Sequence, residues 1–540
     1  MTMTTIPIHE AQVRHQPLHA YVEEHAQVSP DRTAIVCGGS QLTFGQLQSQ
    51  VEQLSAYLSE QGVSHGDTVA LFMQNSPQFV VSLLAVQRLG ATAGPCNPMF
   101  KQWELEYQLN DLDTKVLITF DDLVPVFEKT DTGVQTVVLT RWSDVIEDVS
   151  QVPVEDGAEP VQQTKAPHTV RYAQIIGGER TVPPAAEIDL AQDPALIIYT
   201  SGTTGQPKGA MLSYRNVEFK TACTVQTYGF TSDDVFCAVM PIFHIAGMTV
   251  CMNSPLMVGG TMVIEPRFEP GTMIRDLERH AVTVTYTTPP MNLALLDHPA
   301  MAEADLSAVR LSPGTSFGIK ITREISDRWE EVTGAPLFEW AYGMSETHTG
   351  DTQMPPEAIR YGSHGKPTFD TDVRISDPED PSREMPQGEL GEILVSSPSV
   401  FLGYRGREEA TQKTMHRHWY RSGDLGRIDS EGYLHFEGRN KDLIKSSGYS
   451  VFPEEVERML VRHEAVAQAA VVGYPDPQRG ESVRAFVILE EGQSVTPKEL
   501  IEWSRERMAA YKYPRDVRII QELPTTTTGK LQYAKLRDLD

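Results

Sequence analysis

The sequence predicts an α/β protein with a large N-terminal domain of parallel sheets flanked by helices and a small α+β domain at the C-terminus. Three observations lead to this prediction. The 540 residues exceed what a single hydrophobic core usually organises. Apolar, strand-like segments alternate with amphipathic helical segments in the first part of the chain, and a different order of elements begins near residue 440. The predicted domains are therefore residues 1–440 and residues 441–540.

The N-terminal segments carry the α/β pattern. Residues 42–62 have an apolar stripe with steps of four, three and four residues, which predicts one helix. A buried strand is predicted at 67–75, and a second helix follows, with Ser76 as N-cap and Pro77 at the first helical position. The apolar segments KVLITF and TVVLT continue the alternation. This order favours a largely parallel sheet with helices on both faces.

Two stretches interrupt the pattern. Residues 150–190 are rich in Pro, Gln, Glu and Gly and show little periodicity, so we expect a surface excursion there. Residues 376–389 are rich in turn residues and precede further strands. In the C-terminal region, amphipathic helices are predicted to begin at Pro453 and Pro497, with strands between them.

The charge of the chain limits its partners. Lysine and arginine number 46 against 73 aspartate and glutamate residues, which gives a formal net charge of -27. Such a charge repels nucleic acid phosphates and anionic membrane surfaces. We therefore expect no nucleic-acid partner.

The cysteines and the N-terminus indicate the compartment. The five cysteines are widely spaced and form no C-x-x-C pair, which argues against a disulfide framework and a zinc site. Residues 1–16 lack the apolar core of a signal peptide, and no run of about 18 apolar residues follows. These features predict a soluble, cytoplasmic protein without an integral membrane segment.

A loop of small residues ends in a lysine after the apolar run at 195–198. YTSGTTGQPKG occupies residues 199–209, and its glycines allow backbone N–H groups to approach anionic oxygens. The spacing differs from the P-loop pattern G-x-x-x-x-G-K-[ST]. Taken alone, the loop fits an ordinary turn as well as a polyphosphate site. The candidate phosphate contacts are Thr200, Ser201, Gly202, Thr203, Thr204, Gly205 and Lys208.

This loop and four later motifs resemble the acyl-CoA synthetase, luciferase and peptide-synthetase adenylation superfamily. The four motifs are AYGMSET at 341–347, YRSGDLG at 420–426, GRNKDLIKSSGYSVFPEEVE at 438–457 and PTTTTGKLQYAKLR at 524–537. Because five motifs occur in order over nearly the whole chain, the protein is identified as a member of this superfamily. The resemblance implies a small barrel-like subdomain within the large domain, a mobile C-terminal lid domain, and the use of ATP, Mg²⁺ and coenzyme A. It also allows a homodimer.

The resemblance assigns the nucleotide site. Glu346 offers the hard oxygen ligand that Mg²⁺ prefers, and Ser201 is a second candidate metal contact. Asp424 is suited to hydrogen-bond both ribose hydroxyls, as the acidic residue of dinucleotide folds does. A helix cap and an Asx-turn are the structural alternatives for Glu346 and Asp424. The further candidate ATP or AMP contacts are Gly318, Tyr342, Gly343, Met344, Ser345, Arg439, Lys441 and Lys445.

Lys530 is the candidate catalytic lysine. Attack of a carboxylate on the α-phosphate brings two anions together, with a repulsion of several kcal/mol even at an effective dielectric near 20. One ammonium group that bridges both anions would offset this repulsion. The resemblance also places the hinge between the domains at Lys441. Rotation about it would bring Gly448 to the route of the thiol.

The resemblance also places residues around the acid. The resemblance makes His244 a mobile aromatic residue beside the acid, although a lone histidine among apolar residues is more often a core residue. Acetate-specific relatives carry a bulky Trp where this chain has Gly343, so we expect a cavity longer than two carbons. Met248 and Phe317 are further pocket candidates.

These features predict an ATP-dependent acyl-CoA ligase. A medium- or long-chain fatty acid is the first candidate substrate, and an aromatic acid such as a cinnamate or benzoate is the second. Two other functions stay open. One is a stand-alone adenylating enzyme that loads a carrier protein, and the other is a non-catalytic nucleotide-binding protein of the same fold.

Overall fold

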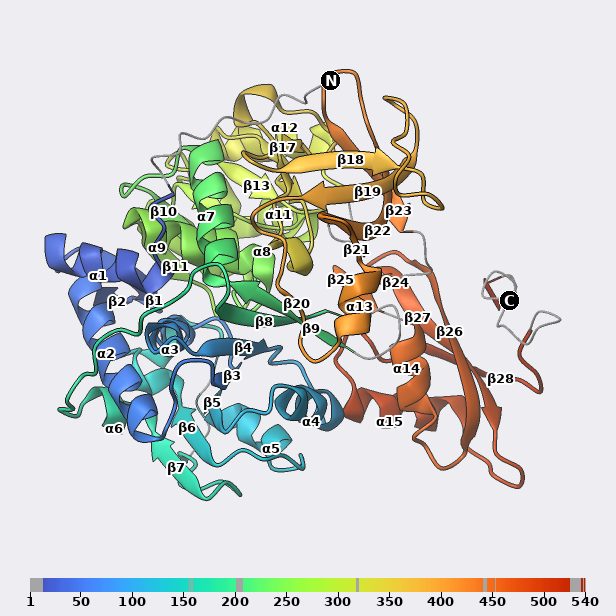
Figure 1. Ribbon diagram of the computed structural model, residues 1–540, viewed down its shortest axis with the longest axis horizontal. Helices are drawn as coiled ribbons and strands as arrows, with labels where there is room; N and C mark the ends of the chain where they lie inside the picture. The colour runs from blue at the N-terminus through green and yellow to red at the C-terminus, as the bar shows by residue number, and fades with distance from the viewer. Residues whose placement is uncertain are drawn as a thin grey trace.

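The structure is a computed structural model that describes residues 13–154, 156, 159–200, 207–316, 320–439, 444–451, 453–524, 536–537 and 539. Two sheets with mainly parallel strands form the N-terminal part, and antiparallel sheets follow toward the C-terminus (Figure 1). None of the helices in the described part of the chain combines the length and the apolar character needed to cross a bilayer.

The larger sheet has eight strands in the order β20-β9-β8-β4-β3-β5-β6-β7. From β8 to β7 neighbouring strands are parallel, and β9 and β20 extend the other edge in antiparallel pairing. The central strands are buried on both faces, as their continuous apolar sequences predict. The strands are β3 (Thr68–Phe72), β4 (Thr92–Cys96), β5 (Val116–Phe120), β6 (Thr136–Thr140), β7 (His168–Arg171), β8 (Pro194–Thr200), β9 (Lys208–Ser213) and β20 (Gly403–Tyr404).

The predicted N-terminal helices are confirmed. Helix α2 (Phe44–Glu60) buries its apolar stripe and begins with a capping box at Thr43. Helix α3 (Pro77–Arg88) begins with Ser76, whose hydroxyl accepts a hydrogen bond from the Phe79 N–H at 3.1 Å. Four shorter helices belong to the same region: α1 (Leu18–Val28), α4 (Gln102–Asp111), α5 (Val124–Phe127) and α6 (Tyr172–Ile176).

The prediction of a surface excursion at 150–190 is wrong in part. Residues 168–171 form β7, which pairs in parallel with β6 at the edge of the large sheet. Helix α6 follows at once and buries Tyr172 and Ile175 completely. A four-residue edge strand has too few positions to show a period, and the five-residue helix α6 is only slightly longer than one helical turn. The sequence signal was therefore too short to detect.

The second sheet has the order β12-β10-β11-β1-β2, and its parallel pairing continues into β13 and β14. Parallel bridges from Val284 to Leu311 and from Thr287 to Gly314 join β12 to the β13 region. The carboxyl ends of β10, β12, β13 and β14 therefore lie along one edge. The strands are β1 (Thr33–Cys37), β2 (Ser40–Thr43), β10 (Val235–Ala238), β11 (Thr261–Ile264), β12 (Val284–Thr285), β13 (Ser312–Gly314) and β14 (Leu337–Glu339).

The helices of this second unit alternate with its strands. Between β10 and β11 the chain forms α8, a π-helical turn and α9 in direct succession. The helices are α7 (Tyr214–Tyr228), α8 (Ile245–Gly247), the π-helix (Met248–Asn253), α9 (Ser254–Val258), α10 (Pro270–Arg279), α11 (Pro289–Leu296) and α12 (Arg323–Thr333).

Antiparallel strands follow, in the region where the resemblance implied a small barrel-like subdomain. One group has the order β15-β16-β17, and a five-stranded group has the order β18-β19-β22-β21 with β23 beside β22. The short helix α13 (Glu408–Lys413) lies between these strands in sequence. The strands are β15 (Ala341–Tyr342), β16 (Thr352–Gln353), β17 (Lys366–Pro367), β18 (Asp372–Ser376), β19 (Gly391–Ser396), β21 (Met415–His416), β22 (Trp419–Ile428) and β23 (Leu434–Arg439).

The C-terminal part is an α+β unit with its own apolar core, as predicted. Its sheet has the order β25-β24-β27-β26, and β28 pairs with β27 in parallel. Helix α15 lies beside α4 of the N-terminal part in Figure 1, and Trp503 packs against Trp103 there. The elements are β24 (Ile444–Ser446), β25 (Tyr449–Val451), α14 (Pro453–Leu460), β26 (Val466–Asp476), β27 (Gly480–Leu489), α15 (Pro497–Arg507) and β28 (Asp516–Ile519).

Candidate active site

A cavity of about 1620 Å³ lies where the parallel strands end and the antiparallel and C-terminal units begin. Ligands of open α/β sheets bind at the carboxyl ends of the strands, because the loops that leave these ends can surround them. The cavity is larger than a pocket for one small molecule, so several substrates can bind in it together. The predicted site residues that line it are Thr200, Lys208, His244, Tyr342, Gly343, Met344, Ser345, Glu346, Asp424, Lys445 and Gly448.

Glu346 is held at the end of the phosphate-loop hairpin. Strands β8 and β9 pair antiparallel up to Thr200 and Lys208, so these two residues flank the loop that joins them. The Thr200 hydroxyl donates a hydrogen bond to Glu346 Oε1 at 3.1 Å, and the Tyr404 hydroxyl donates to the same oxygen at 2.7 Å. The Glu346 side chain is only 7% exposed. Two strands far apart in sequence, β8 and β20, therefore fix one carboxylate beside the loop.

The donor set around Glu346 fits a divalent cation. The Thr200 and Tyr404 hydroxyls both donate to Oε1, so neither of them occupies Oε2. A carboxylate oxygen is the ligand type that Mg²⁺ takes together with nucleotide phosphates. The described residues include no group of three or more His, Cys, Asp or Glu side chains that could hold a metal alone. A metal ion bound here would take its ligands from both Glu346 and a phosphate group of the nucleotide.

Lys208 supplies positive charge at the same place. The lysine is 7% exposed, and its ammonium group lies 5.0 Å from the centre of the Tyr404 ring. An ammonium group at this distance over an aromatic face is stabilised by the ring quadrupole. Tyr404 therefore binds Glu346 through its hydroxyl and orients Lys208 through its ring. Tyr404 was not predicted from the sequence, because it lies outside the five motifs.

A second polar pair also lines the cavity. The Tyr342 hydroxyl donates to Asp424 Oδ2 at 2.9 Å, and Asp424 is 4% exposed. Burial, followed by the charge of Asp424, raises the pKa of Tyr342 well above its usual value, so the phenol stays a donor. In the strand ladder Asp424 pairs with Arg439, which brings two of the predicted nucleotide contacts to one register position. Tyr342 thus holds the Asp424 carboxylate in place.

Gly343 is required by the backbone beside it. A Cβ atom at this position would lie 2.5 Å from Gly350 N and 2.6 Å from Thr349 Cα. Contacts this short are not tolerated, and the opposing atoms are backbone. The glycine is therefore explained by the close approach of the two segments, and its identity alone does not report the length of the acid.

His244 lines the cavity, and Met248 does not. His244 precedes α8 and is exposed toward the cavity, although the protein around it removes the imidazole from bulk water. This burial lowers the pKa of the imidazole, so the ring is neutral near pH 7. Met248 begins the π-helical turn, is fully buried, and is not among the residues that line the cavity. The prediction that Met248 lines the acyl pocket does not fit this structure.

Several predicted residues lie outside the described part of the chain. They are Ser201, Gly202, Thr203, Thr204 and Gly205 of the phosphate loop, Phe317 and Gly318, the hinge residue Lys441, and Lys530. The backbone of Arg439 is described and its side chain is not. The roles of these residues stay predictions.

Comparison with known proteins identifies the family. A model of the AMP-binding enzyme family matches residues 22–405, and a model of the AMP-binding enzyme C-terminal domain matches residues 455–530. The chain belongs to the AMP-binding enzyme family. Within it, the protein is an adenylate-forming acid–thiol ligase of the acyl-CoA synthetase superfamily.

The relatives of this AMP-binding enzyme differ in the acids that their names state. The chain is 33% identical to a long-chain-fatty-acid–CoA ligase of Bacillus subtilis, over 98% of this chain and 95% of the relative. It is 32% identical to a feruloyl-CoA synthase of Amycolatopsis, over 97% of this chain and 99% of the relative. Among solved structures, o-succinylbenzoate CoA synthetase from Bacillus subtilis matches with a TM-score of 0.79 and 26% identity, over 97% and 99% of the two chains.

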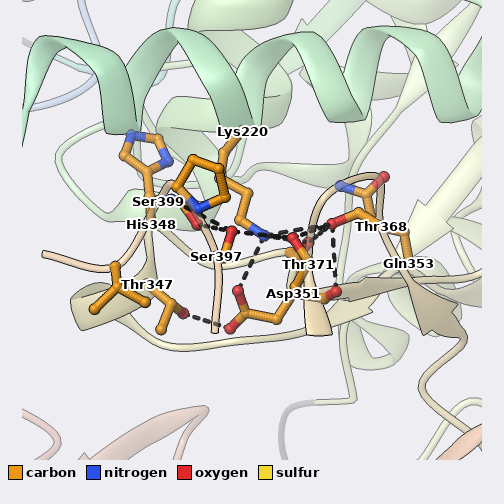
Figure 2. A network of polar contacts seen from close by, with 12 residues as sticks. Lys220, Thr347, His348, Asp351, Gln353, Thr368, Thr371, Ser397 and Ser399 are labelled. Carbon is orange, nitrogen blue, oxygen red and sulfur yellow. Dashed lines mark hydrogen bonds and ion pairs between the residues drawn. The ribbon is translucent and has the colours of Figure 1, made fainter. Parts of the chain in front are cut away.

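A buried ion pair supports the loop that carries Glu346 in this AMP-binding enzyme. Lys220 extends from α7 to Asp351, with Nζ 3.0 Å from Oδ1 and side-chain exposures of 1% and 0% (Figure 2). Lys220 also donates to the Gly350 carbonyl at 3.2 Å, and Thr347 donates to the other oxygen of Asp351. These contacts tie both ends of the segment after Glu346 to α7.

The supported segment has an unusual backbone. His348, Thr349 and Gly350 have φ values of 58°, 56° and 61°, so three successive residues are left-handed. The two that carry side chains each cost about 1–2 kcal/mol in this conformation. Such a turn persists only when its surroundings over-determine it. The Lys220–Asp351 pair is the contact best placed to do so.

We expect Lys220→Met to destabilise the protein by about 3–5 kcal/mol, because it leaves the Asp351 carboxylate buried without its cation. It should also slow acid-dependent pyrophosphate release, because Asp351 belongs to the segment that follows Glu346. Denaturant unfolding and a pyrophosphate assay measure the two effects. Lys115→Met is the matched control, because Lys115 pairs with Asp113 at exposures of 61% and 78%. It should change stability by less than about 1 kcal/mol. Equal effects of the two substitutions would contradict the role of the buried pair.

The C-terminal unit closes one side of the cavity. The turn between β24 and β25 contributes Gly448, with φ of 80°, and Tyr449 follows it. Tyr449 stacks on Tyr511 with ring centres 3.9 Å apart and planes 13° apart. The Asn97 amide of the N-terminal part donates to the Tyr511 hydroxyl at 3.5 Å. Gly448 therefore faces the cavity in this arrangement of the two parts.

A buried cluster at the same contact was not predicted from the sequence. Lys512 Nζ lies 2.6 Å from Glu455 Oε1 in α14 and 3.2 Å from Glu104 Oε1 in α4, and the three side chains are 4–7% exposed. Glu104 also accepts hydrogen bonds from the Lys101 and Ala509 backbone N–H groups at 2.9 Å and 3.4 Å. One lysine therefore joins two carboxylates that belong to different parts of the chain.

Proposed function

We propose that this enzyme activates a carboxylic acid with ATP to acyl-AMP and pyrophosphate and then transfers the acyl group to the thiol of coenzyme A. The observation that carries the proposal is the position of Glu346. Its carboxylate is fixed by Thr200 and Tyr404 beside the phosphate loop, in the same cavity as Asp424 and His244. Phosphate, ribose and acid sites thus share one space.

In the first step, an oxygen of the acid attacks the α-phosphorus of ATP, and pyrophosphate leaves with the electron pair of the broken P–O bond. Lys208 binds phosphate oxygens, the Thr200 hydroxyl keeps its hydrogen bond to Glu346, and the Asp424 carboxylate accepts hydrogen bonds from the ribose. Mg²⁺, bound by Glu346 and the phosphates, would neutralise the charge that develops on them. His244, neutral near pH 7, lies beside the acid without adding a repulsive or competing charge.

In the second step, the thiol sulfur attacks the acyl carbon and loses its proton to solvent, the bond between that carbon and the phosphate oxygen breaks, and AMP leaves with the electron pair as its phosphate dianion. We infer that the thiol enters between the two parts of the chain, where Gly448, Tyr449 and Tyr511 line the cavity. A residue with a side chain at 448 would be strained, because its φ of 80° is in the left-handed region. In this proposal residues 1–440 form the adenylation domain, and residues 441–540 form a lid that turns at Lys441.

The acid is proposed with less detail. A medium- or long-chain fatty acid is the first candidate and an aromatic acid the second. The relatives do not separate them, because a fatty-acid ligase and a feruloyl-CoA synthase are 33% and 32% identical to the chain. Coenzyme A is the proposed acceptor. A carrier-protein thiol is the alternative acceptor. The acceptor also differs among similar proteins, because an amide bond synthetase from Marinactinospora thermotolerans is among the similar structures, with 25% identity and a TM-score of 0.78.

The decisive experiment measures pyrophosphate release with a panel of acids, followed by AMP release with free coenzyme A or a carrier protein. We expect release that depends on the acid, and thioester formation with free coenzyme A. Glu346→Gln should reduce the first step by about 10²- to 10³-fold, the usual loss for one electrostatic contact to the transition state. Its control is Glu357→Gln, at an exposed position, which should not change the rate. No release with any acid would refute the proposal.

A further inference from the structure

A buried carboxyl group lines the cavity and has no task in the proposed reaction. Glu339 is the last residue of β14, and its side chain is 9% exposed. It lies on the edge formed by the carboxyl ends of β10, β12, β13 and β14, which also leads to His244. Among the carboxylates that line the cavity, Asp424 and Glu346 are assigned to ribose and phosphate. The wall at the strand ends is therefore the one left for the acyl group.

Oxygen atoms surround this carboxyl group. The Ser316 backbone N–H donates to both Glu339 oxygens at 3.2 Å, and the Ser316 hydroxyl donates to Oε2. Thr315 and Tyr286 line the cavity beside it. Burial is the main cause that raises the pKa of Tyr286 well above its usual value, and the charges of Cys251 and Glu339 add to it. The Tyr286 hydroxyl therefore stays protonated. The cavity wall that we assign to the acyl group is therefore polar at Glu339. A purely apolar acyl group would not require polar groups there.

No cation neutralises Glu339 among the residues that the structure describes. No lysine, arginine or histidine of that part of the chain forms an ion pair with it, and its contacts are with Ser316 and Thr315. Burial raises the pKa of Glu339 to about 7, against the smaller effect of these hydrogen bonds. Covering such a group with an apolar tail would remove it from cavity water without a replacement partner, which is unfavourable.

We propose that Glu339 is a specificity-determining residue that selects acids with a hydrogen-bond donor, a hydroxyl or an ammonium group, at the end remote from the carboxylate. The donor binds the Glu339 carboxyl group, with the Tyr286 and Thr315 hydroxyls beside it. This inference rests on the proposed function and refines its substrate. It places hydroxylated aromatic acids or ω-substituted chains ahead of unsubstituted fatty acids.

The test compares matched acids by pyrophosphate release. The pairs are cinnamate with its para-hydroxy derivative, and a medium-chain fatty acid with its ω-hydroxy derivative. The wild type should favour the hydroxylated member by about 10- to 100-fold in kcat/KM, the range expected for a hydrogen bond to an ionisable group. Glu339→Leu should bring this ratio close to one. Glu339→Gln, which keeps the shape and an acceptor, should retain part of the preference.

The control is Glu265→Gln. Glu265 is a buried carboxyl group that follows β11 on the same sheet edge and does not line the cavity, so its substitution should leave the ratio unchanged. If Glu339→Leu does not fold, as thermal unfolding would reveal, Glu339→Gln decides the matter. An unchanged ratio, or a higher KM for ATP with an unchanged ratio, would overturn the inference and leave the proposed function intact. Absence of pyrophosphate release with every acid would refute the proposed function itself.

Discussion

Lys512→Met is expected to slow thioester formation from supplied acyl-AMP by about 10²- to 10³-fold while leaving acid-dependent pyrophosphate release nearly unchanged. The substitution leaves Glu104 and Glu455 buried without their shared cation, and breaking such a group typically costs about 3–5 kcal/mol. The cost falls on the arrangement in which Lys512 joins α4 and α14, and Gly448 faces the cavity in this arrangement. The population of this arrangement falls about tenfold for each 1.4 kcal/mol, and the rate of thioester formation falls with it.

Separate assays of the two half-reactions measure this effect. Lys498→Met is a suitable control, because Lys498 is exposed near the start of α15. Glu104→Gln gives a second measurement, since it removes the charge that comes from the N-terminal part and leaves Lys512 paired with Glu455. It should also slow the second half-reaction, by a smaller factor. Equal losses in both half-reactions would show that the cluster acts on overall stability.

Local signals in the sequence were sufficient for much of the fold. The stripe that includes Leu47 and Leu58 identified α2, and Ser76 with Pro77 identified the start of α3, because caps and helical periodicity act within a few residues. The phosphate loop was found for the same reason. A strand that ends in small hydroxyl residues and a lysine is a local pattern, and the structure pairs Thr200 with Lys208 as the ends of that hairpin.

The contacts that hold the site together could not be predicted, because their partners are far apart in sequence. Tyr404 reaches Glu346 only because β20 pairs with β9, and Glu104 reaches Lys512 only because α4 packs against the C-terminal unit. Lys220 is a related case: α7 shows an ordinary helical pattern, and nothing in it marks one lysine as buried opposite Asp351. Burial of a charge is a property of the assembled fold.

Met248 and Gly343 show how a motif can suggest the wrong cause. Met248 stands four residues after His244, and a regular helix would place both near one face. The chain instead forms a π-helical turn from Met248 to Asn253, which changes the spacing and buries the methionine. Gly343 does line the cavity, but the backbone at 349–350 requires it. Pocket length is therefore better judged from Glu339 and its neighbours.

Lys530→Ala is expected to have the opposite effect to Lys512→Met. Acid-dependent pyrophosphate release should fall by about 10²- to 10³-fold or more, while supplied acyl-AMP is still converted to thioester. The reason is electrostatic. Two anions about 4 Å apart repel by about 4 kcal/mol at an effective dielectric of about 20, and the attack of the acid on ATP must overcome this repulsion. The second step joins a thiol to an acyl carbon and needs no cation between two anions.

The two lysines therefore separate the half-reactions. Lys530 lies outside the described residues, whereas Lys512 joins the two parts in the arrangement that brings Gly448 to the cavity. If one arrangement presents Lys530 and the other is stabilised by Lys512, each substitution should remove one half-reaction and spare the other. The double variant should then lose both, with losses that add in free energy because the lysines act in different states. Pyrophosphate release that survives Lys530→Ala would refute this alternation and the assignment of Lys530 together.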